Sequence, residues 1–230
     1  MTAILFLPGM MCDARLFGPQ FDALSGRYTI QAAPIGADET IGEIAAGVLA
    51  EAPPRFCLAG LSMGGIVAME ILRQAPERVV RLALMDTNPL AESAEMKAKR
   101  GPQIEAARSG RLRAVMREEM KPNYLFNGPD KQRILDLCMD MATDLGPGVF
   151  VRQSLALRER RDYGETLKQV TCPTLILCGR HDALCPVERH ELMVDLIPGA
   201  RLEIIEDAGH LPTLEQPEET NTALIRWLEA

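Results

Sequence analysis

The chain has 230 residues, of which 47% are hydrophobic and 25% charged, and its formal net charge is −7 at pH 7. Length and composition suit a soluble globular protein with one large α/β domain, and the negative charge argues against a nucleic-acid partner or an anionic membrane surface. No apolar run approaches the about 20 residues that span a bilayer, and the N-terminus lacks the basic start of a signal peptide, so we expect a cytoplasmic protein without membrane insertion.

Short apolar runs and helical patterns alternate through the first 90 residues. Strands are expected at 4–7, 28–33, 56–59 and 79–85, with helical patterns at 13–25, at 38–50 and from 64 to about 75. The expected strands are continuously apolar, which is typical of strands buried on both faces. The pattern predicts an α/β fold with a mostly parallel central sheet and helices on both faces.

This alternation stops after the strand that ends near Met85. From about Ala91 to Asp162 the sequence has helical stretches broken by pairs such as Gly-Pro, and no strand-like run. We interpret residues 91–162 as a helical cap, or lid, inserted over the carboxyl edge of the sheet, with residues 1–90 and 163–230 as the core domain. Additional core helices on the outer face of the sheet are the alternative.

Alternation resumes in the C-terminal third. The sequence predicts a strand at 173–178, a helix near 186–196, a last strand at 201–205, a loop at 207–210 and a closing helix at 218–229. In an open parallel sheet, reactive groups gather just beyond the carboxyl ends of the strands. We therefore expect the functional site in the loops that follow these strands.

The pentapeptide G-L-S-M-G at 60–64 lies between an apolar strand and a helical pattern. This is the G-x-S-x-G nucleophile elbow, in which a tight turn pushes the serine hydroxyl out above the sheet. Side chains at Gly60 and Gly64 would clash in such a turn. The helix N-terminus that follows favours a developing negative charge. Ser62 is thus the candidate nucleophile, and a flexible turn with an incidental serine is the alternative.

A serine hydroxyl needs a base that takes its proton and a third group that orients the base. Of the three histidines, His210 lies in a loop directly after the last strand, flanked by Gly209 and Leu211, so it is the candidate base. His181 follows the strand at 173–178, and His190 lies in a charged helical segment.

Two carboxylates are candidates for the third group. Asp182 follows the strand at 173–178, and Asp86 follows the strand at 79–85. Both lie where a carboxylate could reach His210, and both fit the chain order Ser, Asp, His.

The six cysteines have no C-x-x-C spacing, and the histidines are scattered. Nothing in this pattern resembles a zinc site, so no metal is expected and the cysteines are interpreted as inert thiols.

Four segments together carry a family resemblance. They are L-P-G-M-M at 7–11, G-L-S-M-G at 60–64, C-P-T-L-I-L-C-G-R-H-D-A-L-C-P at 172–186 and E-D-A-G-H-L-P-T-L-E-Q-P-E at 206–218. The chain resembles the α/β-hydrolase superfamily, and within it the branch of small carboxylesterases, lactonases and carbon–carbon hydrolases. The resemblance implies that Asp182 is the acid of a triad with Ser62 and His210. Since some relatives place the acid at the Asp86 site, that residue stays an alternative.

An oxyanion hole needs two N–H donors aimed at the oxygen of the tetrahedral intermediate. One is expected from the residue after the nucleophile, Met63. The resemblance implies that Met10, in the loop after the first strand, supplies the other. Here Pro8-Gly9 replaces the usual His-Gly pair, which leaves the backbone donor in place.

These residues predict a serine hydrolase that needs no cofactor and cleaves small to medium, mainly apolar carboxylic esters through an acyl-enzyme on Ser62. An enol-lactonase or carbon–carbon bond hydrolase with the same triad is the alternative. A non-hydrolytic small-molecule receptor on the same scaffold is a further alternative, because a fold does not fix a function.

Overall fold

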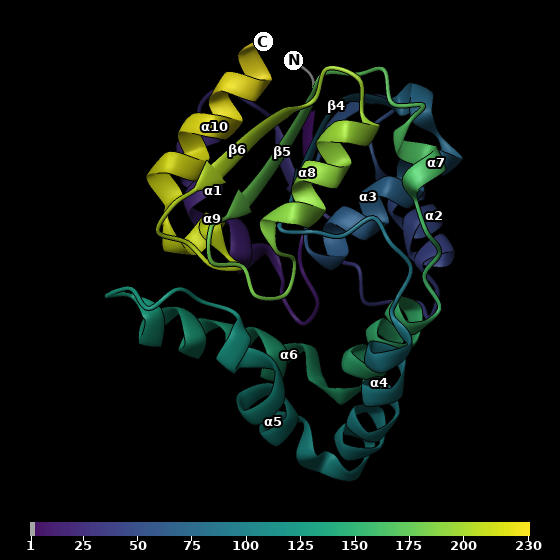
Figure 1. Cartoon of the computed structure of the whole chain (residues 1–230), viewed down its shortest axis with the longest axis vertical. Coiled ribbons are helices and arrows are strands. Elements are labelled where there is room, and N and C mark those ends of the chain that lie inside the picture. The colour runs from purple at the N-terminus through teal and green to yellow at the C-terminus, as the bar shows by residue number, and fades with distance from the viewer. Residues whose placement is uncertain (1–2) are drawn as a thin grey trace.

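The computed structural model describes residues 3–230 and contains a six-stranded parallel sheet (Figure 1). The strand order is β2-β1-β3-β4-β5-β6, and all neighbouring pairs are parallel. The strands are β1 (Ala3–Leu7), β2 (Ile30–Ala32), β3 (Phe56–Leu61), β4 (Val79–Met85), β5 (Thr174–Gly179) and β6 (Arg201–Ile205). The predicted α/β class with a parallel sheet is confirmed.

Helices cover both faces of the sheet. The core helices are α1 (Gly18–Leu24), α2 (Ile41–Glu51), α3 (Met63–Gln74), α7 (Gly164–Leu167), α8 (Val187–Leu196), α9 (Pro212–Glu215) and α10 (Pro217–Glu229). Helices α1, α9 and α10 pack together on one face, and α2, α3, α7 and α8 on the other (Figure 1).

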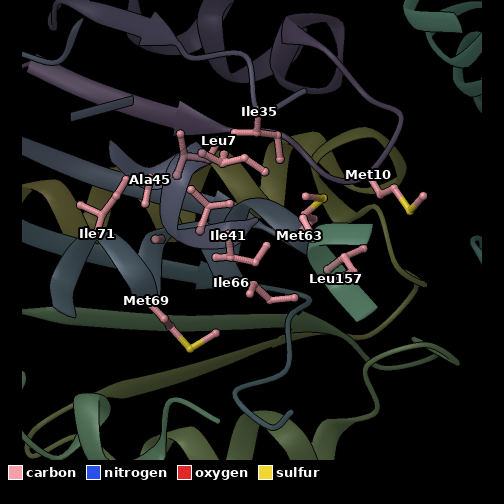
Figure 2. Close-up of a cluster of buried hydrophobic side chains, with 14 of the residues drawn as sticks. Leu7, Met10, Ile35, Ile41, Ala45, Met63, Ile66, Met69, Ile71 and Leu157 are labelled. Atoms are coloured by element: carbon pink, nitrogen blue, oxygen red, sulfur yellow. The ribbon is translucent and has the colours of Figure 1, made fainter. Parts of the chain in front are cut away.

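Two apolar clusters fill the space between the sheet and these helices. Successive side chains of a strand point to opposite faces, so Leu5 and Leu7 of β1 join the cluster under α2 and α3, whereas Ile4 and Phe6 join the one under α1 and α10. Figure 2 shows the first cluster, which includes Leu7 of β1 and Ile41 of α2. Burial on both faces explains why the strands read as continuous apolar runs.

The segment between β4 and α7 is helical and lies beyond the carboxyl ends of the strands (Figure 1). It comprises α4 (Ala94–Ala106), α5 (Leu112–Ala114) between two π-helical turns, a 3₁₀ turn at Lys121–Asn123 and α6 (Lys131–Arg158). Helix α6 bends at Gly146, whose φ of 77° and ψ of 175° are non-helical, and Pro147 follows directly. That residues 91–162 act as a separate cap domain stays a prediction.

Within residues 3–230, no helix combines the length and the apolar character that crossing a bilayer requires.

Candidate active site

Ser62 lies at the turn that joins β3 to α3. Its φ of 55° and ψ of −116° are unusual for a residue with a side chain, and such strain is a feature of functional turns. A Cβ at Gly60 would overlap the carbonyl of Gly64, and a Cβ at Gly64 would overlap the carbonyl of Leu7. The two glycines are therefore required, and the turn presents a half-buried Ser62 hydroxyl at the carboxyl edge of the sheet.

The structure brings Ser62, His210 and Asp182 into one hydrogen-bonded row. His210 Nε2 lies 2.9 Å from Ser62 Oγ, and His210 Nδ1 lies 2.8 Å from Asp182 Oδ2. His210 follows β6 and Asp182 follows β5, so three strand ends supply the three side chains. His210 and Asp182 are buried, with exposed fractions of 4% and 3%. This is the arrangement in which a histidine removes a serine proton.

Asp182 is held as a carboxylate by its neighbours. Its Oδ1 accepts hydrogen bonds from the amides of Leu184 at 2.8 Å and Cys185 at 2.9 Å. Burial by itself would raise the pKa of Asp182, but the interaction with His210 and these two amides hold the pKa below its usual range. A charged Asp182 can stabilise an imidazolium on His210.

Asp86, the alternative acid, has no hydrogen bond to His210 within residues 3–230, and His210 Nδ1 pairs with Asp182. Its own Oδ1 accepts a 2.9 Å hydrogen bond from the amide of Gly179, and its side chain is inaccessible to solvent. Burial first, and the nearby Asp182 charge second, raise the pKa of Asp86 well above its usual range. The geometry thus favours Asp182 over Asp86 as the residue that orients His210.

The two expected oxyanion donors lie on either side of the elbow. Met63 is the first residue of α3, where a backbone N–H has no partner within the helix. Met10 lies in the loop after β1, and its amide has no acceptor within residues 3–230. The next residue, Met11, has a φ of 56° and donates its amide to Gln153 Oε1 of α6 at 2.9 Å. Figure 2 shows the Met10 and Met63 side chains at the same end of the core cluster as Leu157.

The loop that carries His210 depends on Glu215, a residue that sequence reasoning missed. Glu215 Oε2 accepts hydrogen bonds from the amides of Gly209 and Leu211, both at 3.0 Å, and Oε1 accepts one from Phe126 at 2.7 Å. Burial raises the pKa of Glu215, while these amides act in the opposite direction. The only sequence signal was a carboxylate five residues after the candidate base.

The other two histidines have different surroundings. His190 is completely buried, and its Nε2 accepts a 3.1 Å hydrogen bond from the amide of Thr87. His181 is exposed and stacks on Phe126 with ring centroids 4.6 Å apart. Neither is hydrogen-bonded to Ser62 in the described part of the chain.

Potential metal ligands within residues 3–230 come together at Asp182, Cys185 and His210. Asp182 and His210 are already hydrogen-bonded to each other, and burial raises the pKa of the Cys185 thiol well above its usual range, which disfavours the thiolate that a metal would need. The donor set therefore does not fit a metal ion, and we assign none.

Comparison with known proteins identifies the family of this chain. Residues 4–223 match the model of the alpha/beta hydrolase family, and the chain belongs to that family. This confirms the resemblance that the four sequence segments carried.

Relatives of the chain include proteins that are named as esterases. The chain is 26% identical over 243 aligned positions to the pimeloyl-[acyl-carrier protein] methyl ester esterase of Aliivibrio salmonicida, which covers 98% of this chain and 92% of that protein. It is 30% identical over 186 positions to the carboxylesterase YbfK of Bacillus subtilis, covering 74% of this chain and 56% of that protein.

Solved structures show the same fold. A thermophilic esterase from Thermogutta terrifontis superposes with a TM-score of 0.90 at 28% identity, covering 100% of this chain and 90% of that one. The enol-lactonase from Burkholderia xenovorans superposes with a TM-score of 0.88 at 22% identity, covering 100% and 92%.

Proposed function

We propose that this α/β hydrolase is a serine esterase that cleaves small to medium, mainly apolar carboxylic esters through an acyl-enzyme on Ser62. The observation that carries the proposal is the unbroken row from Ser62 Oγ through His210 to the Asp182 carboxylate. Nucleophilic catalysis by a serine needs a base and a group that orients the base, and this row supplies both. Relatives named as esterases support the hydrolytic interpretation.

In the first half-reaction, Ser62 Oγ attacks the ester carbonyl carbon while His210 Nε2 takes the hydroxyl proton. Asp182 stabilises the imidazolium that forms. The carbonyl oxygen becomes an oxyanion, for which the amides of Met10 and Met63 are the proposed donors, each worth about 2.7–4 kcal/mol. His210 then gives its proton to the departing alcohol, and the acyl group stays on Ser62.

In the second half-reaction, water takes the place of the alcohol. His210 removes a proton from the water, the resulting hydroxide attacks the acyl-enzyme carbonyl, and the Ser62–acyl bond breaks. The proton returns to Ser62 Oγ through His210, and the carboxylic acid leaves. Every proton in this cycle passes through His210 Nε2, while Nδ1 keeps its hydrogen bond to Asp182.

A panel of p-nitrophenyl esters, lactones and amides tests the proposal. We expect a rapid initial release of p-nitrophenol equal to the enzyme concentration, followed by slower turnover, because acylation and hydrolysis are separate steps. Ser62→Ala and His210→Ala should each lose nearly all activity, since triad members act as a unit. Ser25→Ala, which removes an exposed serine, is the matched control.

A serine-directed phosphonate gives a second readout. It should label Ser62, as located by peptide mass mapping, and no label should appear in Ser62→Ala. Residual esterase activity within about tenfold of wild type in Ser62→Ala, or an adduct on Cys12 or Cys185, would contradict the assignment. Turnover of lactones alone would replace the ester substrate by a lactone at the same site.

A further inference from the structure

A buried carboxyl group that takes no part in the proposed hydrolysis lies next to Asp182. Asp86 directly follows β4 with a φ of 45°, and its side chain is inaccessible to solvent. Its Oδ1 accepts the hydrogen bond from Gly179, whereas its Oδ2 has no donor within residues 3–230. A buried carboxylate oxygen without a donor is costly, and a proton on that oxygen removes the cost.

The surroundings of Asp86 are acidic. The Asp182 carboxyl group lies within hydrogen-bonding reach, Glu215 is the next acidic group, and the thiols of Cys178 and Cys185 are also close. His190, a second buried imidazole near Asp182, is neutral at neutral pH because burial lowers its pKa to about 4. Burial and the Asp182 charge raise the pKa of Asp86 well above its usual range, and the Gly179 amide opposes this less strongly.

Asp182 has the opposite surroundings. Its Oδ2 faces His210 and its Oδ1 faces two amides, so each of its oxygens has donors from the protein. Two adjacent buried carboxyl groups cannot both be ionised without a large penalty, and the proton goes to the one with fewer donors. Here that group is Asp86.

We propose that Asp86 is a positioning residue of the triad: as a neutral carboxylic acid it donates a hydrogen bond from Oδ2 to the Asp182 carboxylate and holds that carboxylate against His210. Asp86 then touches neither the substrate nor His210. It affects catalysis by fixing the position of Asp182 and by delocalising part of the negative charge of Asp182. The kinetic consequence rests on the proposed function, whereas the protonation state of Asp86 does not.

Two variants separate this role from simple space filling. Asparagine has the shape of a protonated aspartic acid, and its amide can donate to Asp182, so Asp86→Asn should keep kcat within about threefold of wild type. Asp86→Ala removes the donor, and we expect kcat to fall about tenfold to a hundredfold with KM little changed, as for a lost hydrogen bond to a charged group. Circular dichroism and thermal unfolding establish that each variant is folded.

Two measurements need no substrate. The infrared spectrum of the wild type at neutral pH should contain the C=O stretch of one buried protonated carboxylic acid, and Asp86→Asn should lack it. By carbon-13 NMR at neutral pH, the Asp86 carboxyl carbon should have the chemical shift of a protonated acid, and the Asp182 carboxyl carbon that of a carboxylate. The Asp182 signal should stay that of a carboxylate in Asp86→Asn.

Other outcomes overturn the proposal. Absence of the acid band, or a carboxylate chemical shift for the Asp86 carbon at neutral pH, would mean that Asp86 is ionised in the wild type. A kcat loss in Asp86→Asn as large as that in Asp182→Asn would mean that Asp86 is itself the triad acid. If the wild type hydrolyses no ester, the proposed function fails, and the infrared and NMR results still decide the state of Asp86.

Discussion

The main-chain carbonyl of Ser62 accepts a 2.7 Å hydrogen bond from the hydroxyl of Thr87, the second residue after β4. The amide of Thr87 in turn donates to His190 Nε2 at 3.1 Å, and His190 Nδ1 donates to the carbonyl of Pro186 at 3.3 Å. A buried histidine therefore supports the strained backbone of Ser62 through Thr87. Nε2 can accept only while the His190 ring is neutral, and burial lowers the pKa of His190 to about 4.

This lowered pKa predicts a specific loss of stability in acid. An unfolded histidine has a pKa of about 6.5, so between about pH 6.5 and pH 4 the unfolded chain binds more protons than the folded one. The free energy of unfolding should fall as the pH falls through this window, by on the order of 3 kcal/mol from His190. Urea titrations at several pH values measure this free energy of unfolding.

His190→Gln should flatten this pH dependence, because glutamine can accept from Thr87 but does not titrate. His181→Gln, which removes an exposed imidazole, should keep the wild-type slope. Equal slopes in His190→Gln and the wild type would show that His190 does not contribute.

A second prediction concerns the glycine of the elbow that packs against β1. In Gly64→Ala the new methyl group would overlap the main chain of Leu7, which cannot move without disturbing the sheet. We expect a loss of about 4 kcal/mol or more, or no folded protein. Soluble yield and urea unfolding measure this.

Gly18→Ala is the control, since a Cβ there meets no atom within 4 Å and its backbone is helical. It should change stability by at most about 1 kcal/mol, in the stabilising direction. If Gly64→Ala changes the free energy of unfolding by no more than about 1 kcal/mol, the close approach of the elbow to Leu7 is wrong.

A third prediction addresses the His210 loop. Glu215→Gln replaces a carboxylate that accepts from three amides by a side chain with one acceptor oxygen. We expect kcat/KM to fall about tenfold and Tm to drop, because His210 loses its fixed position. Glu218→Gln, at an exposed position of α10, should change neither. A Glu215→Gln variant with wild-type kcat/KM would show that the loop holds its shape without this carboxylate.

The fourth prediction concerns the acyl group. Met10 and Met63 lie buried beside the elbow, and methionine side chains adapt to apolar groups of different shape. We expect kcat/KM to rise from acetyl to butyryl or hexanoyl p-nitrophenyl esters, by up to about 0.8 kcal/mol per buried methylene, and then to fall for longer chains. Monoesters of dicarboxylic acids should be poor substrates.

A preference for dicarboxylic monoesters would contradict that expectation. The candidate residue to bind the anionic acyl group would then be Arg100. It pairs with Glu92 at 2.6 Å, and its Nη1 lies 3.9 Å from Met10 Sδ. Kinetics of Arg100→Gln on neutral and anionic esters would then test whether Arg100 binds the acyl group.

The sheet, the elbow and the position of His210 were predictable because short-range signals specify them. Continuous apolar runs indicate buried parallel strands, and the glycines around Ser62 have a local steric cause. One expected strand, 28–33, is shorter in the structure, where β2 spans Ile30–Ala32 at the sheet edge.

The supporting contacts were not predictable, because they join residues far apart in the sequence. Glu215 and Phe126 are 89 positions apart, and His190 and Thr87 are 103 apart. No periodicity or spacing brings such pairs together. The preference for Asp182 over Asp86 likewise came from family resemblance, and it is the three-dimensional arrangement that places Asp182 against His210.

Ser62 and His210 are 148 positions apart, and they meet only when the loop after β6 has docked. On the ribosome the serine emerges long before the histidine, so a nascent chain can assemble β1 to β4 and the elbow while its hydroxyl has no base. By the proposed mechanism, such an unfinished chain hydrolyses no ester, because Ser62 has no base. In a refolding experiment the return of hydrolysis consequently reports the arrival of the C-terminal segment, later than the collapse that fluorescence or circular dichroism follows.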